Sequence, residues 1–315
     1  MKWFFKLIIS LCISFVILNI FSFFYYNVPS RTQDVDNATE YKWPANSFYS
    51  RLTEGISFGT VNNDGYNNEL DYNSDTIINN LLMGSSQVEG FNVFKDDTIA
   101  SMLNRMTNTY TYNIGISEHT LPICISNLDN SLSKYKPTDN VIIETMTVSF
   151  YEDQLYDAIN KQVSLETYSS GIIDYLQNFK YLKLAYYQLG NIKKGNDISE
   201  PRSVNNEMML NDLLSYAKEV SDKYGVNLII VFHPSLTIDN SGNIYVNYNE
   251  NDMDIFSKVC SSNDIKFINM EDDFINRYNE TYELPHGFVN TLPGVGHLNA
   301  VGNELIANKL KEEIE

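Results

Sequence analysis

The hydrophobic residues form one long run at the N-terminus and several short runs further along the chain. The long run, residues 7–26, contains twenty residues without a charge, and Asn19 is its one strongly polar side chain. About 20 helical residues, at 1.5 Å each, span the roughly 30 Å hydrocarbon core of a bilayer. The pattern therefore predicts a membrane-spanning helix within residues 1–28.

The flanking charges predict how this helix is oriented. Lys2 and Lys6 precede the run, whereas Arg31 is followed by an acidic segment. The positive-inside rule then places the N-terminus in the cytoplasm and the rest of the chain outside it. A cleaved secretory signal is the alternative, but its apolar core is usually shorter, and no A-x-A-like site comes after this run. We expect a single-pass cell-membrane anchor.

The rest of the chain predicts a stem and then an α/β domain. Residues 29–75 are polar and Asn-rich, which predicts an extracytoplasmic stem that packs loosely on the domain. Residues 76–315 alternate between short β-branched runs and stretches with helical spacing, the pattern of a parallel sheet with right-handed crossovers. The predicted strands are 76–83, 112–116, 141–144, 228–232 and 265–268, and the predicted helices are 97–106, 121–134, 204–224, 253–262 and 300–315. Residues 151–205 are too long for a crossover and predict a helical insertion, whose aromatic stripe packs as core or lid.

Composition narrows the classes of partner. There are 22 Lys and Arg residues against 40 Asp and Glu, so the net charge is -18. Such a surface repels nucleic-acid phosphates, which argues against a nucleic-acid partner. Three cysteines without metal-ligand spacing exclude a structural zinc site and are too few for a disulfide framework. The sequence leaves open whether Cys124 and Cys260 pair.

Two distant segments predict nucleophilic catalysis. Residues 84–90 (GSSQVEG) fit a strand-to-helix turn that presents Ser86 at the carboxyl edge of the sheet, where open α/β sheets bind ligands. Backbone N–H groups at the start of the helix can stabilise an oxyanion. His297 precedes the last helix on a glycine-rich loop, from which it can reach the same edge as a general base.

These motifs resemble the SGNH or GDSL-type hydrolases. The family's Gly-Asp-Ser turn matches residues 84–86, its oxyanion-hole glycine matches Gly115, and its final block matches GHLNxxGxxxIA at residues 296–307, the most specific part. The resemblance covers about residues 77–314 apart from the insertion. It implies a flavodoxin-like three-layer α/β/α fold, with Ser86 as nucleophile, His297 as base and the N–H groups of Ser86 and Gly115 in the oxyanion hole.

The sequence departs from the family pattern at three places. Ser85 replaces the usual Asp, and the third block, residues 141–147, has no Asn, so that oxyanion donor is missing or is supplied by Thr145 or another group. Gly294 stands where the family has the acid that orients the histidine. The site is then a Ser-His dyad, is impaired, or recruits an acid from elsewhere, for which the candidates are Asp272, Asp273 and Glu283.

Three further polar residues lie near the predicted edge. Glu89 follows the nucleophile turn, and Glu118 and His119 follow the Gly115 loop. They are candidate substrate-binding residues, although solvated loop polarity explains them as well.

The anchor and the SGNH-like domain together suggest a cell-envelope role. The layout resembles anchored SGNH-like proteins of bacterial polysaccharide O-acetylation and of D-alanyl-lipoteichoic acid biosynthesis. We expect an extracytoplasmic O-acyl esterase or O-acyltransferase acting on a surface polysaccharide without metal or organic cofactor. A transferase would need a multi-pass membrane partner to deliver acyl groups. The alternative is a catalytically inactive SGNH-like envelope protein that binds glycan or assembles a complex.

Overall fold

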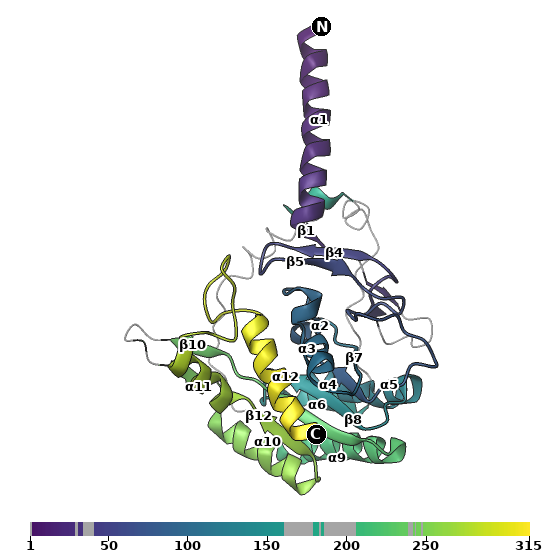
Figure 1. Cartoon of the computed structure of the whole chain (residues 1–315), viewed down its shortest axis with the longest axis vertical. Coiled ribbons are helices and arrows are strands. Elements are labelled where there is room, and N and C mark those ends of the chain that lie inside the picture. Colours follow the sequence, from purple (N-terminus) through teal and green to yellow (C-terminus); the bar gives the residue numbers. More distant parts are fainter. Residues whose placement is uncertain are drawn as a thin grey trace.

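An apolar helix, α1 (Lys2–Tyr25), projects from the rest of the molecule in the computed structural model (Figure 1). The structure describes residues 2–28, 31–33, 41–160, 179–182, 184–185, 206–238, 242, 244–246 and 248–315. Within these residues α1 is the one helix long and apolar enough to cross a membrane, and nearly all of it is exposed. A signal sequence near the N-terminus passes the same test of length and composition.

The central sheet has five parallel strands in the order β12-β9-β8-β6-β7. This is the flavodoxin-like order, in which the second strand of the sheet lies at one edge beside the first. The sheet contains β6 (Asn80–Met83), β7 (Thr111–Asn113), β8 (Asn140–Thr145), β9 (Asn227–Phe232) and β12 (Lys266–Asn269). Each of the five predicted strands is confirmed, because strands buried on both faces read as continuous apolar runs.

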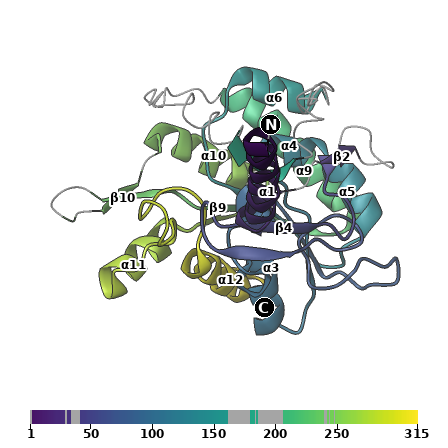
Figure 2. The same cartoon turned by 90° about the horizontal axis from the view of Figure 1, so that it is seen from above.

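Helices cover both faces of the sheet (Figure 2). Val141 and Ile143 of β8 pack into one core, and Ile142 between them packs into the other. The first layer contains α4 (Leu121–Ser126), α5 (Leu128–Tyr135), α6 (Glu152–Ile159), α9 (Glu207–Tyr224) and α10 (Glu250–Ser262). The second contains α2 (Ser86–Glu89), α3 (Ile99–Met106), α11 (Glu271–Thr281) and α12 (Ala300–Ile314), preceded at α3 by the 3-10 turn η1 (Lys95–Asp97). The three-layer α/β/α fold is therefore as predicted.

Two helices differ from the prediction. The helix predicted over 121–134 is interrupted at Asn127, which ends α4 and precedes α5. Helix α11 was not predicted, since Phe274 is its one fully buried residue and its apolar stripe is therefore weak. Most of the predicted insertion at 151–205 lies outside the described residues, apart from α6 at its start and six residues between 179 and 185.

The N-terminal segment forms a small antiparallel sheet against the α/β domain. This sheet contains β1 (Tyr26–Asn27), β4 (Phe48–Arg51) and β5 (Ser57–Thr60). The same segment also contains a short pair, β2 (Thr32–Gln33) with β3 (Tyr41–Lys42). A separate short pair, β10 (Leu236–Ile238) with β11 (Ile244–Val246), lies after β9 in the chain. Tyr49 of β4 is fully buried and stacks on Phe91, with ring centroids 4.1 Å apart. Trp43 and Val61 are buried in the same cluster.

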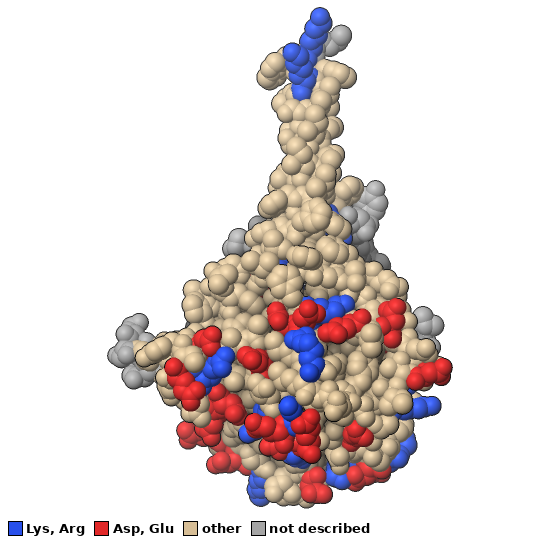
Figure 3. All heavy atoms as spheres, viewed as in Figure 1, with Lys and Arg blue, Asp and Glu red and all other residues tan. Residues whose placement is uncertain are grey.

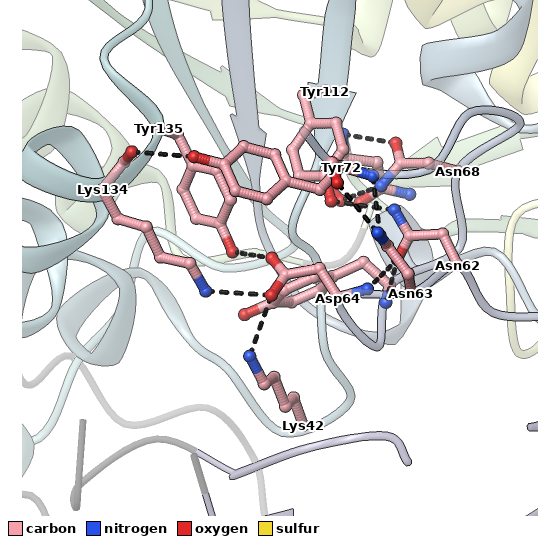
Figure 4. A network of polar contacts seen from close by, with 11 residues as sticks. Lys42, Asn62, Asn63, Asp64, Asn68, Tyr72, Tyr112, Lys134 and Tyr135 are labelled. Carbon is pink, nitrogen blue, oxygen red and sulfur yellow. Dashed lines mark hydrogen bonds and ion pairs between the residues drawn. The ribbon is translucent and has the colours of Figure 1, made fainter. Parts of the chain in front are cut away.

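A polar network also joins this segment to the domain (Figure 4). The Asp64 carboxylate contacts Lys42 and Lys134, each at 3.0 Å, and accepts a hydrogen bond from the Tyr135 hydroxyl. Asn62 donates to the Tyr112 hydroxyl at 2.8 Å. The prediction of loose packing is thus wrong for residues 41–75, because their polar side chains make internal hydrogen bonds. The division of the chain into anchor, stem and domain stays a prediction.

Candidate active site

Ser86 is the first residue of α2, directly above the carboxyl end of β6. The Ser85 hydroxyl caps α2 by accepting the Gln87 N–H at 3.3 Å, and Gly90 ends the helix with a φ of 69°. A Cβ on Gly84 would lie 2.6 Å from both a Glu144 carboxylate oxygen and a Val88 methyl group, so only glycine fits where the strand turns into the helix. The predicted strand-to-helix turn is confirmed.

His297 meets Ser86 from the other end of the chain. Its Nε2 lies 2.9 Å from the Ser86 Oγ, within hydrogen-bond range. The loop that carries it is fixed by an antiparallel bridge between His286 and Leu298, and the Leu298 N–H donates to the Gln87 side-chain oxygen at 2.7 Å. Gln87 thus ties the nucleophile helix to the histidine loop.

The carboxylate beside His297 is Glu54, from the turn between β4 and β5. Glu54 Oε1 lies 2.8 Å from His297 Nδ1, and the same oxygen accepts the His297 backbone N–H at 2.8 Å. Burial alone would raise the pKa of the Glu54 carboxyl, but the hydrogen bonds and charge of His297 and the charge of Arg51 hold it below its usual value. Glu54 is therefore ionised at neutral pH and places a negative charge 2.8 Å from His297 Nδ1.

This geometry supplies the third residue of the site, which the sequence left open. The expected candidates were Asp272, Asp273 and Glu283, and none of them lies beside the Nδ1 atom. Glu283 pairs with Arg277 at 2.8 Å, while Asp272 and Asp273 lie in the first turn of α11. Glu54 was missed because it is 243 residues from His297 and precedes the region of the resemblance. The one local signal is its position before a turn glycine, Gly55.

Glycines allow the histidine loop to approach Glu54. Gly296 has a φ of +99°, and a Cβ there would lie 2.2 Å from Glu54 Oε1. Gly294 has a φ of +76°, with the Leu236 carbonyl oxygen 3.1 Å from the place of a Cβ. Both positions favour glycine for backbone reasons. Gly294 therefore has its own structural role, and the acid that the family places there is supplied from the N-terminal segment.

The Glu54 turn is held in place from two sides. The Asn290 side chain donates to the carbonyls of Leu52 and Gly55 at 2.9 and 3.0 Å, and accepts the Gly55 N–H at 3.0 Å. Asn92 donates to the Glu54 carbonyl at 3.0 Å. These bonds fix the carboxylate relative to the histidine loop and the nucleophile helix.

A second acid and histidine lie buried behind Ser85. Glu144 Oε2 accepts both the backbone N–H and the hydroxyl of Ser85 at 2.9 Å, and Glu144 Oε1 lies 2.8 Å from His233 Nε2. The His286 ring lies 5.5 Å from that of His233, and its two nitrogens have no partner among the described residues. Burial, with the neighbouring charges of His233 and His297, lowers the pKa of His286 to about 3. His286 is thus neutral at ordinary pH.

The predicted oxyanion donors differ in whether they already donate a hydrogen bond within the protein. The Ser86 N–H lies in the first turn of α2, where backbone N–H groups have no acceptor within the helix. The Gly115 N–H instead donates to Asn113 Oδ1 at 2.7 Å, and the Thr145 hydroxyl donates to the Thr147 carbonyl at 2.7 Å. Each of these two groups would have to give up a hydrogen bond to serve in the oxyanion hole. Close packing explains the glycine at position 115, because a Cβ there would lie 2.5 Å from the Val88 side chain.

The three predicted substrate-binding residues make contacts of their own within the fold. Glu89 is buried and accepts hydrogen bonds from Trp43 Nε1 at 2.8 Å and from Ser117, so its carboxylate fastens the N-terminal segment. His119 is also buried, and burial first, with the charge of Arg31, lowers its pKa to about 4. Glu118 is exposed and pairs with Arg31 at 3.2 Å. Glu89 and His119 are thus buried in internal contacts, and the substrate-binding role of the three residues stays a prediction.

The described residues contain no group of three His, Cys, Asp or Glu side chains suited to hold a metal ion. Cys124 and Cys260 are both buried and form no disulfide, which answers the question that the sequence left open.

No protein-family model matches the sequence, and a search of the curated proteins found no match. Among solved structures, the chain is similar to the psychrotrophic esterase EstA from Pseudoalteromonas sp., inhibited by monoethylphosphonate, with 14% identity over 75% of this chain and 96% of that one, and a TM-score of 0.41. It is similar to a member of the lipolytic protein G-D-S-L family from Veillonella parvula DSM 2008, with 13% identity, 74% and 96% coverage and a TM-score of 0.40. It is also similar to the acetyl xylan esterase AlAXEase, with 15% identity, 75% and 100% coverage and a TM-score of 0.38.

Proposed function

We propose that this protein is an SGNH-type serine esterase or O-acyltransferase. The observation that carries the proposal is the line of contacts from Ser86 Oγ to His297 Nε2 and from His297 Nδ1 to Glu54. Nucleophile, base and orienting acid in this order are the parts that acyl transfer through a serine requires. The acid that was missing at residue 294 was the main reason to consider a non-catalytic envelope protein, and Glu54 removes that reason.

The reaction proceeds in two acyl-transfer steps. His297 Nε2 takes the Ser86 proton as Oγ attacks the carbonyl carbon of an acyl ester, and the Ser86 N–H stabilises the negative oxygen of the tetrahedral intermediate. The intermediate collapses to an acyl-serine when His297 protonates the leaving alcohol. Water or a sugar hydroxyl then gives its proton to His297 and attacks the acyl-serine, which releases acid or a new ester and restores Ser86.

The proposed location of this chemistry, outside the cell membrane, depends on the role of α1. We infer that α1 is a single-pass anchor with its N-terminus in the cytoplasm, since Lys2 and Lys6 lie at its free end. The domain then lies outside the membrane, where acyl-ester substrates include surface polysaccharides. Transfer, as opposed to hydrolysis, requires an acyl donor, for which a multi-pass membrane acyltransferase is the proposed partner.

Hydrolysis of p-nitrophenyl acetate by the full chain in detergent tests the proposed chemistry. Ser86→Ala is expected to lower the rate by about 10⁴-fold or more. Ser74→Ala, an exposed serine in a distant turn, is the matched control and is expected to keep the wild-type rate. Hydrolysis that survives Ser86→Ala would overturn the assignment of the nucleophile.

A further inference from the structure

The domain begins directly where α1 ends, without a linker. β1 follows Tyr25 at once and pairs with β4, and the Leu52 N–H donates to the Tyr25 carbonyl at 3.0 Å. The Ser50 hydroxyl donates to the carbonyl of Phe23 at 2.8 Å, and the Phe23 ring stacks on Phe48 with centroids 5.3 Å apart. The orientation of the domain relative to α1 is thus fixed by hydrogen bonds and packing.

A second segment, which includes residues 179–182 (FKYL), lies against the last turns of α1 (Figure 1, teal). The Phe179 ring is 5.7 Å from that of Phe15, and the Tyr181 N–H donates to Asn19 Oδ1 at 3.3 Å. The Asn19 amide donates in turn to the Phe15 carbonyl at 2.8 Å. Asn19, the one strongly polar side chain of the uncharged run at residues 7–26, is therefore hydrogen-bonded, as a polar group inside a bilayer must be.

Exposed apolar side chains lie on the two segments that carry Glu54 and His297. Val289 is 97% exposed and Leu292 is 70% exposed, and both lie on the loop that leads to His297. Ile56 and Phe58, 51% and 56% exposed, follow Glu54. The two groups are neighbours, because Asn290 is hydrogen-bonded to the turn at residues 52–55. The loop around residues 285–299 rises toward the end of α1 in Figure 1.

Charged side chains, in contrast to these apolar ones, lie mainly away from α1. In the face shown in Figure 3, acidic side chains gather on the half of the domain away from α1, and the part next to α1 is largely uncharged. With a net charge of -18, most of the protein surface is repelled by anionic lipid head groups. The uncharged part beside α1 is the part that can approach a lipid surface at low cost.

We propose that a lipid bilayer covers this apolar face, so that Val289, Leu292, Ile56 and Phe58 contact the lipid interface and the Ser86 site opens at the membrane surface. The proposal rests on the proposed function, since it takes α1 as the anchor. It deepens that function by assigning an acyl ester that is presented at the lipid surface rather than one that diffuses freely in water. Apolar side chains that enter the boundary between lipid head groups and acyl chains are removed from water, which favours binding of the face to the bilayer.

Fluorescence in lipid nanodiscs tests the proposal with the full chain. Cys12 is the one exposed cysteine, so it carries an NBD label in the wild type and reports on α1 itself. In a Cys12→Ala background, Val289→Cys places the label on the proposed face, and Leu292→Cys is a second probe in case the first variant does not fold. Glu312→Cys, at the far end of α12 with its side chain 70% exposed, is the matched control. The nanodiscs contain phosphatidylcholine with or without brominated acyl chains.

The expected result is a blue-shifted NBD emission at residues 289 and 292 that brominated lipid quenches, and neither effect at residue 312. Probes at residues 289 and 292 that show neither the blue shift nor the quenching, like the probe at residue 312, would overturn the proposal. A membrane protein that covers the face in place of lipid would give the same absence of quenching, and it would overturn the proposal as well. An unquenched Cys12 probe would overturn it by removing the anchor. Phosphonate labelling of Ser86 in the same samples reports on the chemistry separately, so a labelled serine without lipid contact overturns this inference alone.

Discussion

Glu54 and His297 lie 243 residues apart in the sequence, yet Glu54 Oε1 is 2.8 Å from His297 Nδ1 and accepts the His297 backbone N–H. Glu54 follows β4, which pairs with the strand that continues from α1. The N-terminal segment thus connects the apolar helix to the domain and also completes the site. Loss of packing in this segment is expected to disable catalysis as well as orientation.

Glu54→Gln is expected to reduce kcat by about 10²- to 10⁴-fold, because the uncharged amide no longer stabilises the imidazolium that forms during attack. KM should change little, since Glu54 acts on His297 and not on substrate. Glu283→Gln, which removes a carboxylate that pairs with Arg277, is the control and should leave kcat unchanged. Steady-state hydrolysis of p-nitrophenyl acetate measures both. Equal rates for Glu54→Gln and wild type would mean that the site works as a Ser-His dyad.

Gly296→Ala is expected to separate Glu54 from His297. The new Cβ would lie 2.2 Å from Glu54 Oε1 at a φ of +99°, so the carboxylate or the loop must move. Displacement of a catalytic group by about 1 Å can reduce the rate by about 10²-fold. Gly225→Ala is the matched control, because it has a φ of +72° but nothing within 4 Å of the new Cβ. The control should lose about 1 kcal/mol of stability and no activity. Similar activity in the two variants would contradict the clash.

Glu144→Gln is expected to disturb the nucleophile turn. One amide oxygen cannot replace both carboxylate oxygens, which contact Ser85 and His233. The loss of buried hydrogen bonds should lower the free energy of unfolding by roughly 2–4 kcal/mol, and kcat should fall with it. Glu89→Gln changes another buried carboxylate, which contacts Trp43 and Ser117 instead. Because it leaves the contact between Glu144 and Ser85 intact, Glu89→Gln should lower stability with a smaller loss of kcat than Glu144→Gln. Thermal unfolding and kinetics of the two variants, measured side by side, check the difference.

Acid is expected to destabilise the fold through His286. Its pKa is about 3 in the folded protein against 6.5 for an ordinary histidine, so between these values the unfolded chain binds a proton that the folded chain does not. Stability from this group is therefore lost as the pH falls below 6.5. At pH 5 the loss is about 2 kcal/mol. His286→Phe should remove this pH-dependent loss of stability. The difference in the free energy of unfolding between wild type and variant should therefore change by about 2 kcal/mol between pH 7 and pH 5. A difference independent of pH would show that His286 is not buried in its neutral form.

The parts of the fold that could be predicted from the sequence are those whose signals are local. A strand such as β8 is buried on both faces and reads as an apolar run, and Ser86 and His297 are marked by the glycines around them. Long-range contacts have no such signal. Glu54 is an acid in a turn with no motif around it, and its role depends on where the N-terminal sheet packs.

The buried polar residues were missed for the same reason. Glu144 lies next to the last residue of β8 and His233 directly follows β9, and neither position carries a local signal for their contact. Their contact joins adjacent parallel strands, because β8 and β9 are paired in the sheet. The oxyanion role of Gly115 was assigned from a motif match, whereas the hydrogen bond from its N–H to Asn113 is a property of the folded loop.

The most direct test of the catalytic site is covalent labelling of the full chain with a serine-directed phosphonate and then peptide mass spectrometry. We expect one adduct, on Ser86, which forms at a much lower rate in His297→Ala and in Glu54→Gln. No adduct on Ser86, or labelling at the same rate in His297→Ala, would contradict the claim that these residues form a nucleophilic site.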